Sequence, residues 1–357
     1  MKKILVVDDS ALMRRVLCDI IKTDPEFEVA QTASDGLEAL EILKKTSFDA
    51  VVCDVNMPKM SGLGLLKELQ KNQIPARVMM ASTDTKEGSK TALDALDLGA
   101  LDFVHKPDRS FDCRNAEFQE EFLRTLHAVS DSKAPTFQRT TVSNASAIDR
   151  TRKLASLVKK SGPMGGKSIV AIASSTGGPK ALQSVIPRLP ANLDAPVLLV
   201  QHMPVGFTKT LADRLNAASE ITVKEAEEGE ILTKGCVYLS KGGMHMNVVP
   251  KNGNTVIHYS NEPIREGVKP CANYMYESLV NCSFDNIVGV VMTGMGADGT
   301  AGMKNLKNAK KVHVIAQEET TCAVYGMPKA IVKEGLSDQI VPLEQIAQEI
   351  ILHTGVN

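Results

Sequence analysis

Three residue types that together suit nucleophilic catalysis occur in the second half of the chain, each just after a predicted strand. They are Ser175 after Ile169–Ala173, His202 after Val197–Val200, and Asp298 in a glycine-rich turn after Ile287–Met292. A serine becomes nucleophilic when a base takes its proton, and histidine titrates in a suitable range. A carboxylate can hold that imidazole in the required tautomer. Because parallel strands end at one edge of a sheet, the three side chains could share a crevice.

The turn around the serine, Ser174-Ser175-Thr176-Gly177-Gly178, precedes a predicted helix that begins at Pro179. Hydroxyl groups beside the free N–H groups of a helix N-terminus suit either a nucleophilic serine or a phosphate cradle. The turn alone does not separate these two functions, whereas His202 and Asp298 at neighbouring strand ends favour the nucleophile.

The turn around Asp298 also fits a dinucleotide-binding fingerprint. Gly294–Gly299 matches G-x-G-x-x-G, and Glu318 and Glu319 follow about 20 residues later. Two features oppose this interpretation: Asp298 would place a negative charge beside a pyrophosphate, and too little chain follows Val312 for a complete nucleotide-binding sheet. A dinucleotide-binding oxidoreductase therefore remains the weaker alternative, beside an output domain that binds a partner without catalysis.

The first half carries a second group of polar residues at strand ends. Five strands are predicted here, at Ile4–Val7, Val29–Thr32, Ala50–Cys53, Val78–Ala81 and Phe103–Val104. Polar residues that could bind a ligand follow four of them: Asp8 and Asp9, Asp54, Ser82, and Lys106. Converging carboxylates repel each other, and a hard cation such as Mg²⁺ with oxygen ligands relieves that repulsion. A lysine and a hydroxyl at the same edge could hold the oxygens of a phosphoryl group.

The elements that must position these residues alternate between short strands and helices in both halves. This pattern predicts a five-stranded parallel sheet first and a doubly wound α/β domain second. Within the second domain, Cys236–Leu239, Met246–Val249 and Val256–Tyr259 predict an antiparallel insertion, with a hairpin turn at Asn252-Gly253. We expect domains at residues 1–129 and 168–357.

The stretch between them, residues 130–167, is rich in small and polar residues and holds eight basic against two acidic side chains. Residues 148–160 could form a basic amphipathic helix that docks on an acidic partner. A basic, flexible and solvated linker is the interpretation we favour.

The composition excludes several classes of function. The chain has 357 residues, is 43% hydrophobic and 23% charged, and carries a net charge of −1, which gives no argument for binding nucleic acid. No apolar run reaches the roughly 18 residues of a membrane-spanning helix. Seven scattered cysteines suggest neither a disulfide framework nor a zinc site. We expect a cytoplasmic monomer.

The first 125 residues or so resemble the receiver domain of two-component response regulators. The motifs that carry the resemblance are Asp8-Asp9, Asp54-Val55-Asn56-Met57-Pro58, Ser82, and Phe103-Val104-His105-Lys106-Pro107. The resemblance implies a flavodoxin-like fold in which a histidine kinase phosphorylates Asp54. It further implies that Asp8, Asp9, Asp54 and the main-chain carbonyl of Asn56 hold Mg²⁺. Ser82 and Lys106 would sense the phosphoryl group, and Phe103 matches the switch aromatic.

The second half resembles the chemotaxis protein-glutamate methylesterase (CheB) family. The matching segments are Ser174–Gly178, Gln201–Pro204, Thr293–Gly296 with Asp298-Gly299, and Tyr325–Pro328. The resemblance implies a nucleophile at Ser175, a base at His202 and an orienting acid at Asp298, with Met295 in the oxyanion hole and Thr176 beside the nucleophile.

The expected activity is demethylation of glutamyl γ-methyl esters, and deamidation of glutamines, on the cytoplasmic helices of chemoreceptors. Phosphorylation would control it, and the catalytic domain would need no cofactor. Ala173 and Ser174 stand where Gly and Ala are common, so Ser174 is a rival nucleophile. We favour Ser175 because it directly precedes Thr-Gly-Gly.

Overall fold

The computed structural model describes residues 1–83, 86–107, 113, 115–135 and 166–356. The chain divides into two compact units, Met1–Arg139 and Thr140–Asn357. The predicted linker, residues 130–167, and its predicted helix at 148–160 fall largely or wholly on residues 136–165, outside the described residues. No helix in the described part of the chain is long and apolar enough to cross a membrane.

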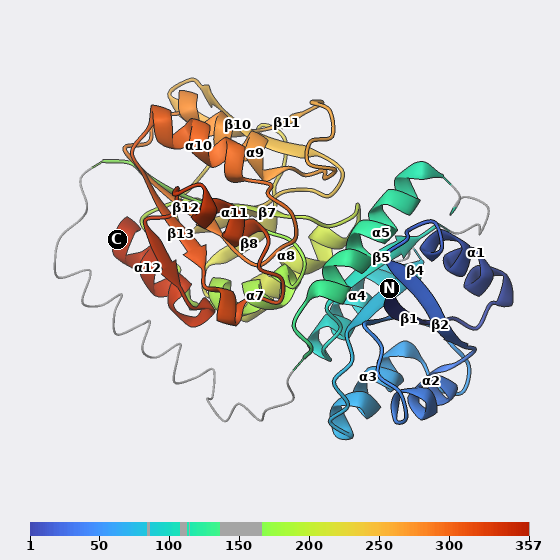
Figure 1. Cartoon of the computed structure of the whole chain (residues 1–357). Coiled ribbons are helices and arrows are strands. Elements are labelled where there is room, and N and C mark those ends of the chain that lie inside the picture. Colours follow the sequence, from blue (N-terminus) through green and yellow to red (C-terminus); the bar gives the residue numbers. More distant parts are fainter. Residues whose placement is uncertain (84–85, 108–112, 114, 136–165, 357) are drawn as a thin grey trace. The chain divides into compact units, whose positions relative to one another are not determined.

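The first unit is the predicted parallel sheet, with strand order β2-β1-β3-β4-β5. Each predicted strand is confirmed, within slightly wider bounds: β1 Lys2–Val7, β2 Phe27–Ala33, β3 Ala50–Asp54, β4 Val78–Thr83 and β5 Asp102–Lys106. The helices between and after the strands are α1 Ala11–Ile21, α2 Gly36–Leu43, α3 Gly62–Lys71, α4 Lys86–Asp97 and α5 Ala116–Asp131. Figure 1 shows the helices on both faces of this sheet.

Short polar side chains begin several of these helices. Ser10, Asp35, Ser61 and Asn115 each accept a hydrogen bond from a main-chain N–H of the first turn. Such caps satisfy donors that have no partner inside the helix. The apolar faces of α1 and α5 pack on β1, β3 and β4 in one buried cluster. These caps mark where each of the four helices begins, after the end of the preceding strand.

The second unit contains a seven-stranded sheet in which every neighbouring pair is parallel. Its order is β14-β13-β12-β6-β7-β9-β8. The strands are β6 Ser168–Ser174, β7 Val197–Gln201, β8 Thr222–Glu225, β9 Cys236–Leu239, β12 Asn286–Val291, β13 Val312–Gln317 and β14 Gln339–Val341. The chain moves from β6 towards β8 on one side and from β12 towards β14 on the other. The strand order therefore reverses between β6 and β12, and ligands of such sheets bind outside the strand ends at that point.

Helices cover this sheet on both faces (Figure 1). They are α7 Gly178–Val185, α8 Phe207–Ala218, α9 Ala272–Ser278, α10 Thr300–Ala309, α11 Met327–Lys333 and α12 Ile346–Thr354, with short 3₁₀ turns η3 Ile186–Arg188, η4 Leu279–Asn281, η5 Glu319–Thr321 and η6 Leu343–Gln345. The α9, α10 and α11 helices share a large apolar cluster with residues of β6, β7, β12 and β13. The predicted doubly wound α/β fold is confirmed.

The antiparallel insertion is smaller than predicted. The hairpin β10 His245–Lys251 and β11 Asn254–Ser260 is present, with Asn252 and Gly253 at its turn in positive φ as that turn requires. The prediction for Cys236–Leu239 was wrong, because this segment is β9 and pairs in parallel with both β7 and β8. All four of its residues are buried. Its place inside a sheet explains the continuous apolar run, which an exposed hairpin strand would interrupt.

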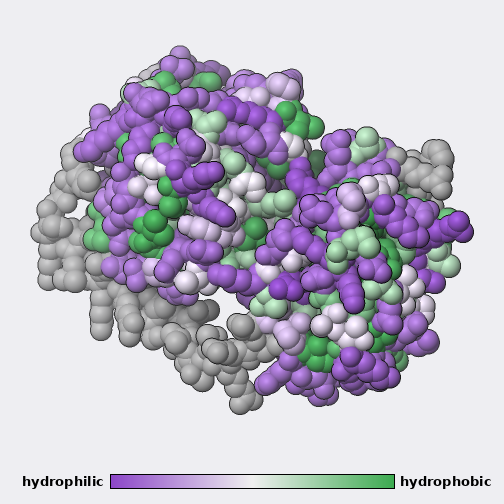
Figure 2. Space-filling view, viewed as in Figure 1, coloured by the Kyte–Doolittle hydropathy of each residue, from purple (hydrophilic) through white to green (hydrophobic). Residues whose placement is uncertain are grey.

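The visible surface of each unit is mainly hydrophilic, with small separate apolar areas (Figure 2). Large apolar side chains that are exposed lie at scattered positions: Met1, Leu12, Leu37, Val205, Ile231, Ile264, Ile340 and Leu352. Isolated residues of this kind are normal on a folded protein. The described surface therefore gives no argument for a second function based on an apolar patch.

Candidate functional sites

The first site lies at the carboxyl end of the sheet in residues 1–139. Asp8 follows β1 and Asp54 ends β3, so the pairing of these two strands brings their carboxylates together. Oxygen atoms of Asp8, Asp9 and Asp54 lie within 4.8 Å of one another. This set of oxygen ligands fits a hard divalent cation such as Mg²⁺. Three of the predicted metal-binding residues are therefore brought together.

Lys106, the last residue of β5, reaches across to the same carboxylates. Its Nζ donates to Asp8 Oδ2 at 2.9 Å and to Asp54 Oδ1 at 2.7 Å, and all three side chains are nearly buried. Burial raises the pKa of Asp54 above its usual value, and the Asp8 carboxylate adds to this effect, while Lys106 offsets only part of it. Burial alone would lower the pKa of Lys106, but the attraction of Asp54 and Asp8 is stronger and raises it.

The remaining predicted residues of this site occupy the same edge or the adjoining core. Ser82 is buried near the end of β4, where the preceding residue, Ala81, pairs with Asp54. Phe103 is buried within β5, and Asn56 is exposed two residues beyond Asp54. The strand ends thus gather a carboxylate cluster, a lysine and a hydroxyl, which is the chemistry expected for holding a cation and a phosphoryl group.

The second site lies where the strand order reverses, at the end of β6. Ser175 is partly exposed, and its main-chain N–H donates to Thr293 O at 3.0 Å, which ties it to the end of β12. Ser174 differs, because its side chain is completely buried and its hydroxyl donates to Gln201 Oε1 at 2.7 Å. Of the two adjacent serines, only Ser175 has a side chain accessible to a ligand.

His202 directly follows β7 and faces Asp298 from the loop after β12. The His202 Nε2 and Asp298 Oδ2 atoms are 2.7 Å apart, and both residues are largely buried. Within the described residues, no hydrogen bond joins the Ser175 hydroxyl to His202, and contacts of this kind often tighten only when substrate binds. The structure therefore joins the predicted base and acid directly, and it places the predicted nucleophile on the neighbouring strand end.

Asp298 is stabilised as a carboxylate by several donors besides His202. It accepts from the N–H groups of Ala272 at 2.6 Å, Asn273 at 3.0 Å and Gly299 at 2.8 Å, and from Cys271 Sγ at 3.0 Å. Burial alone would raise its pKa, but the hydrogen bonds from His202, Cys271 and Ala272 together outweigh burial and lower the pKa. Asp298 therefore stays ionised, and an ionised Oδ2 requires the proton of the shared bond to be on His202 Nε2.

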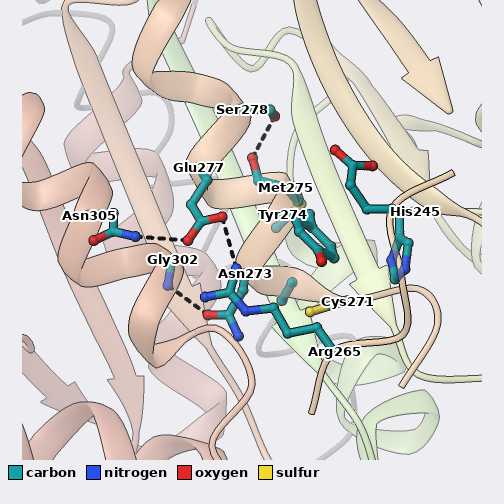
Figure 3. Close-up of polar contacts among 12 residues, drawn as sticks. His245, Arg265, Cys271, Asn273, Tyr274, Met275, Glu277, Ser278, Gly302 and Asn305 are labelled. Carbon is teal, nitrogen blue, oxygen red and sulfur yellow. Dashed lines mark hydrogen bonds and ion pairs between the residues drawn. The ribbon is translucent and has the colours of Figure 1, made fainter. Parts of the chain in front are cut away.

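Two of the donors to Asp298, Ala272 and Asn273, lie in the first turn of α9, and α9 is anchored by polar contacts (Figure 3). The Asn273 side chain accepts from the N–H of Gly302 in α10 at 2.6 Å. Glu277 accepts from Arg265 at 2.9 Å and from Asn305 at 2.8 Å. A Cβ at Gly302 would lie 2.4 Å from the main-chain oxygen of Asn273, so the two helices approach too closely for a side chain there. The position of α9 relative to Asp298 is thereby fixed.

The loop from Thr293 to Gly299 holds Met295, the predicted oxyanion residue. A Cβ at Gly294 would lie 2.7 Å from Ser175 Cβ, so this loop packs directly against the nucleophile. The Thr293 hydroxyl donates to the carbonyl of Thr176 at 3.0 Å, and Gly326 N–H donates to Gly294 O at 3.0 Å. Thr176 is buried and follows Ser175 directly, and Met295 is partly exposed and follows Gly294, which packs against Ser175.

Sequence reasoning missed several residues of this site. Four groups that were not predicted form hydrogen bonds to residues of this site: Cys271, the N–H groups of α9, Gln201 and Gln317. Cys271 lies 27 residues before Asp298 and belongs to no recognisable motif. Gln201 immediately precedes His202 and begins the matching segment Gln201–Pro204, and these two signals could have pointed to it.

Fold and sites together define a class of protein: a response regulator whose receiver sheet is followed by an α/β enzyme domain with a buried His–Asp pair. Residues 4–114 match the response regulator receiver domain, and residues 170–350 match the family described as CheB methylesterase. The chain belongs to the CheB methylesterase family.

Relatives support this membership over almost the whole chain. The chain is 42% identical over 349 residues to a protein of Pyrococcus abyssi named protein-glutamate methylesterase/protein-glutamine glutaminase, an alignment that covers 98% of this chain and 92% of the relative. A Bacillus subtilis protein of the same name is 40% identical over 354 residues, 98% of each chain. The solved CheB methylesterase catalytic domain of Thermotoga maritima is 41% identical, with a TM-score of 0.51, covering 53% of this chain and 98% of that one.

Proposed function

We propose that this chain hydrolyses glutamyl γ-methyl esters on chemoreceptors with Ser175 as nucleophile, His202 as base and Asp298 as the orienting acid. The observation that carries the proposal is the 2.7 Å bond between His202 Nε2 and an ionised Asp298 beside an accessible Ser175. Membership of the CheB methylesterase family supplies the reaction class. The names of the relatives supply the substrate class, a protein glutamate ester or a glutamine.

Each proton transfer in the proposed mechanism has a defined direction. Because Nε2 donates to Asp298, Nδ1 is the nitrogen left to take the proton of the Ser175 hydroxyl. The serine oxygen then bonds to the ester carbonyl carbon, and the negative oxygen is stabilised by N–H groups of the turns, including that of Met295. His202 returns the proton to the departing oxygen, so methanol leaves. Water, activated by the same base, cleaves the acyl-enzyme and leaves a free glutamate.

The same steps apply to a glutamine side chain, with ammonia as the leaving group in place of methanol. Thr176 is buried beside the nucleophile, and its carbonyl accepts a hydrogen bond from the Thr293 hydroxyl, which holds the turn that carries Ser175. No step of this sequence draws on a group other than the chain, the substrate and water.

We further propose that phosphorylation of Asp54 by a histidine kinase raises this activity. Asp8, Asp9, Asp54 and the carbonyl of Asn56 would hold Mg²⁺, which neutralises charge on phosphoryl oxygens when bound. Lys106 and Ser82 would contact the phosphoryl group, and Phe103 would respond to that contact. This scheme assigns residues 1–129 to regulation, 130–167 to a linker and 168–357 to catalysis.

The two alternative functions receive less support. In the dinucleotide interpretation Asp298 would face a ligand at the start of α10, yet its carboxylate bonds instead to His202 and to the first turn of α9. An output domain that only binds a partner would not need a buried histidine paired with an ionised aspartate beside an exposed serine.

The decisive experiment measures methanol released from methylated chemoreceptor fragments by the full chain and by two serine variants. We expect Ser175→Ala to abolish release, because the nucleophile is lost. We expect Ser174→Ala to keep methanol release within severalfold of the parent, because Ser174 is buried and already bonded to Gln201. Release by Ser175→Ala but not by Ser174→Ala would contradict the assignment of the nucleophile, and equal release by both variants and the parent would contradict a serine mechanism.

A further inference from the structure

We propose that Gln201 is a positioning residue that sets the distance between the nucleophile-bearing turn and the base. Its side-chain amide donates to Ser175 O at 2.9 Å and to His202 O at 3.0 Å. These two carbonyls belong to the two residues whose side chains react. The inference rests on the proposed function for the roles of Ser175 and His202. It assigns a role to Gln201, which the proposed mechanism does not use.

The chemistry of the amide explains why glutamine occupies this position. Its NH₂ group supplies two donors for the two carbonyls, while its oxygen accepts from the Ser174 hydroxyl at 2.7 Å. Glutamate would offer no donor when ionised, and an aliphatic side chain would offer none at all. Gln201 is only 1% exposed, so a donor lost here is not replaced by bulk water.

The neighbouring turn is shaped around this side chain. A Cβ at Gly178 would lie 2.0 Å from Gln201 Oε1 and 3.0 Å from Ser174 Cβ, so only glycine leaves room for the amide. The buried serine also acquires a role, because its hydroxyl fixes the orientation of the amide. Ser174 thus holds Gln201, and Gln201 holds both Ser175 and His202.

Main-chain hydrogen bonds provide part of this geometry, and the Gln201 side chain adds to them. One main-chain bond, from His202 N–H to Ser174 O at 3.1 Å, links the ends of β6 and β7 here. Gly178 N–H also donates to Ser175 O at 2.7 Å, so the Gln201 amide adds a second donor at the nucleophile, and the same amide reaches the His202 carbonyl at the next strand end. An error of about 1 Å in such a pair can lower a rate by about 100-fold.

A second glutamine provides a structural comparison. Gln317, at the end of β13, bonds through its side chain to Thr293 N at 2.8 Å and Thr321 O at 2.8 Å. In the sheet order β13-β12-β6-β7, the two glutamines lie on either side of the central pair and each reaches towards the end of an adjacent central strand. Only Gln201 contacts the residues that carry the nucleophile and the base.

The test compares the full-length parent with Gln201→Met, which keeps the volume and removes both donors. Two readouts are used: the steady-state kinetics of methanol release, and the rate at which a fluorophosphonate probe modifies Ser175. We expect kcat and the labelling rate to fall about 10- to 100-fold, with KM changed less than about twofold, because Gln201 is buried beneath the reacting residues. Ser174→Ala, which only frees the amide to rotate, should lower both rates severalfold.

The matched control is Tyr238→Phe, which removes a buried hydroxyl bonded to Thr233 and Ile231 in the same unit, away from the reacting residues. A loss of labelling in Gln201→Met no larger than in this control, at comparable thermal stability, would overturn the proposal. If Gln201→Met does not fold, Ser174→Ala decides by the same comparison. Slower labelling without methanol release by the parent would uphold the positioning role and contradict the proposed substrate instead.

Discussion

In residues 1–139 the buried carboxylate of Asp54 faces a lysine and a second carboxylate, whereas in the second unit Asp298 faces an imidazole, a thiol and main-chain N–H groups. Both lie at or just beyond the end of a parallel strand, yet their pKa values move in opposite directions. Among the described residues, Asp54 has one main-chain donor, from Val55, while Asp298 has three.

The difference shows how the surroundings of a buried carboxylate suit its chemistry. A raised pKa means that the ionised form of Asp54 is poorly stabilised by the protein alone, which favours the binding of a cation beside it. A lowered pKa keeps Asp298 charged beside a histidine that must accept a proton. The surroundings of Asp54 therefore favour the binding of a cation, whereas the donors around Asp298 already stabilise its negative charge.

The strongest way to break this comparison is Asp298→Asn. The amide cannot accept all the donors around it and no longer stabilises a protonated His202, so we expect kcat for methanol release to fall by about 10³- to 10⁴-fold. Mg²⁺-dependent uptake of a phosphoryl group at Asp54 should be unchanged, measured with a small-molecule phosphodonor. A parallel loss of phosphoryl uptake would show that the two sites are not independent in the way their separate sheets imply.

Lys106→Met tests the first site by removing its cation. Two buried carboxylates are then left uncompensated, and we expect the first unit to lose about 3–5 kcal/mol of stability near neutral pH. Urea unfolding followed by circular dichroism measures the change, and added Mg²⁺ should stabilise this variant more than the parent, because Lys106 no longer competes for the carboxylates.

Lys59→Met is the control for this prediction, since Lys59 also pairs with a buried aspartate, Asp35, but is itself largely exposed. We expect it to change stability far less. Equal effects of the two substitutions would mean that burial of the cation is unimportant at the Asp54 site.

The smallest expected effect is a pH dependence at Asp298. Its pKa is lower in the folded chain than the value near 3.9 of an unfolded one, so its contribution to stability is fully present above about pH 4 and is lost as the pH falls through the folded value. The Ala272 and Asn273 amides donate hydrogen bonds to Asp298. Their protection from hydrogen exchange, corrected for the intrinsic rate, should fall as the pH drops through the folded pKa of Asp298. Protection that is already lost above about pH 4 would contradict the lowered pKa.

Much of the fold was predictable because strand and helix patterns are local. All five strands of the first unit are confirmed, and so is the hairpin at Asn252-Gly253, whose turn residues favour positive φ. The Cys236–Leu239 segment was misassigned because its apolar run is compatible with more than one kind of strand pairing. Which neighbours a strand pairs with depends on distant segments, here β7 and β8.

The sequence by itself determined which residue types stand at the strand ends, because each follows directly from the chain's local pattern: Asp8, Asp54 and Lys106 in one unit, and Ser175, His202 and Asp298 in the other. The sequence favoured Ser175 over Ser174 through the Thr-Gly-Gly that follows it, and only the tertiary structure showed that Ser174 is buried and bonded to Gln201 from the neighbouring strand. It likewise revealed that Asp298 is held by Cys271 and α9. The physical reason is that hydrogen bonds to a buried group come from whichever segments fold against it, and the local sequence of those segments does not reveal that contact.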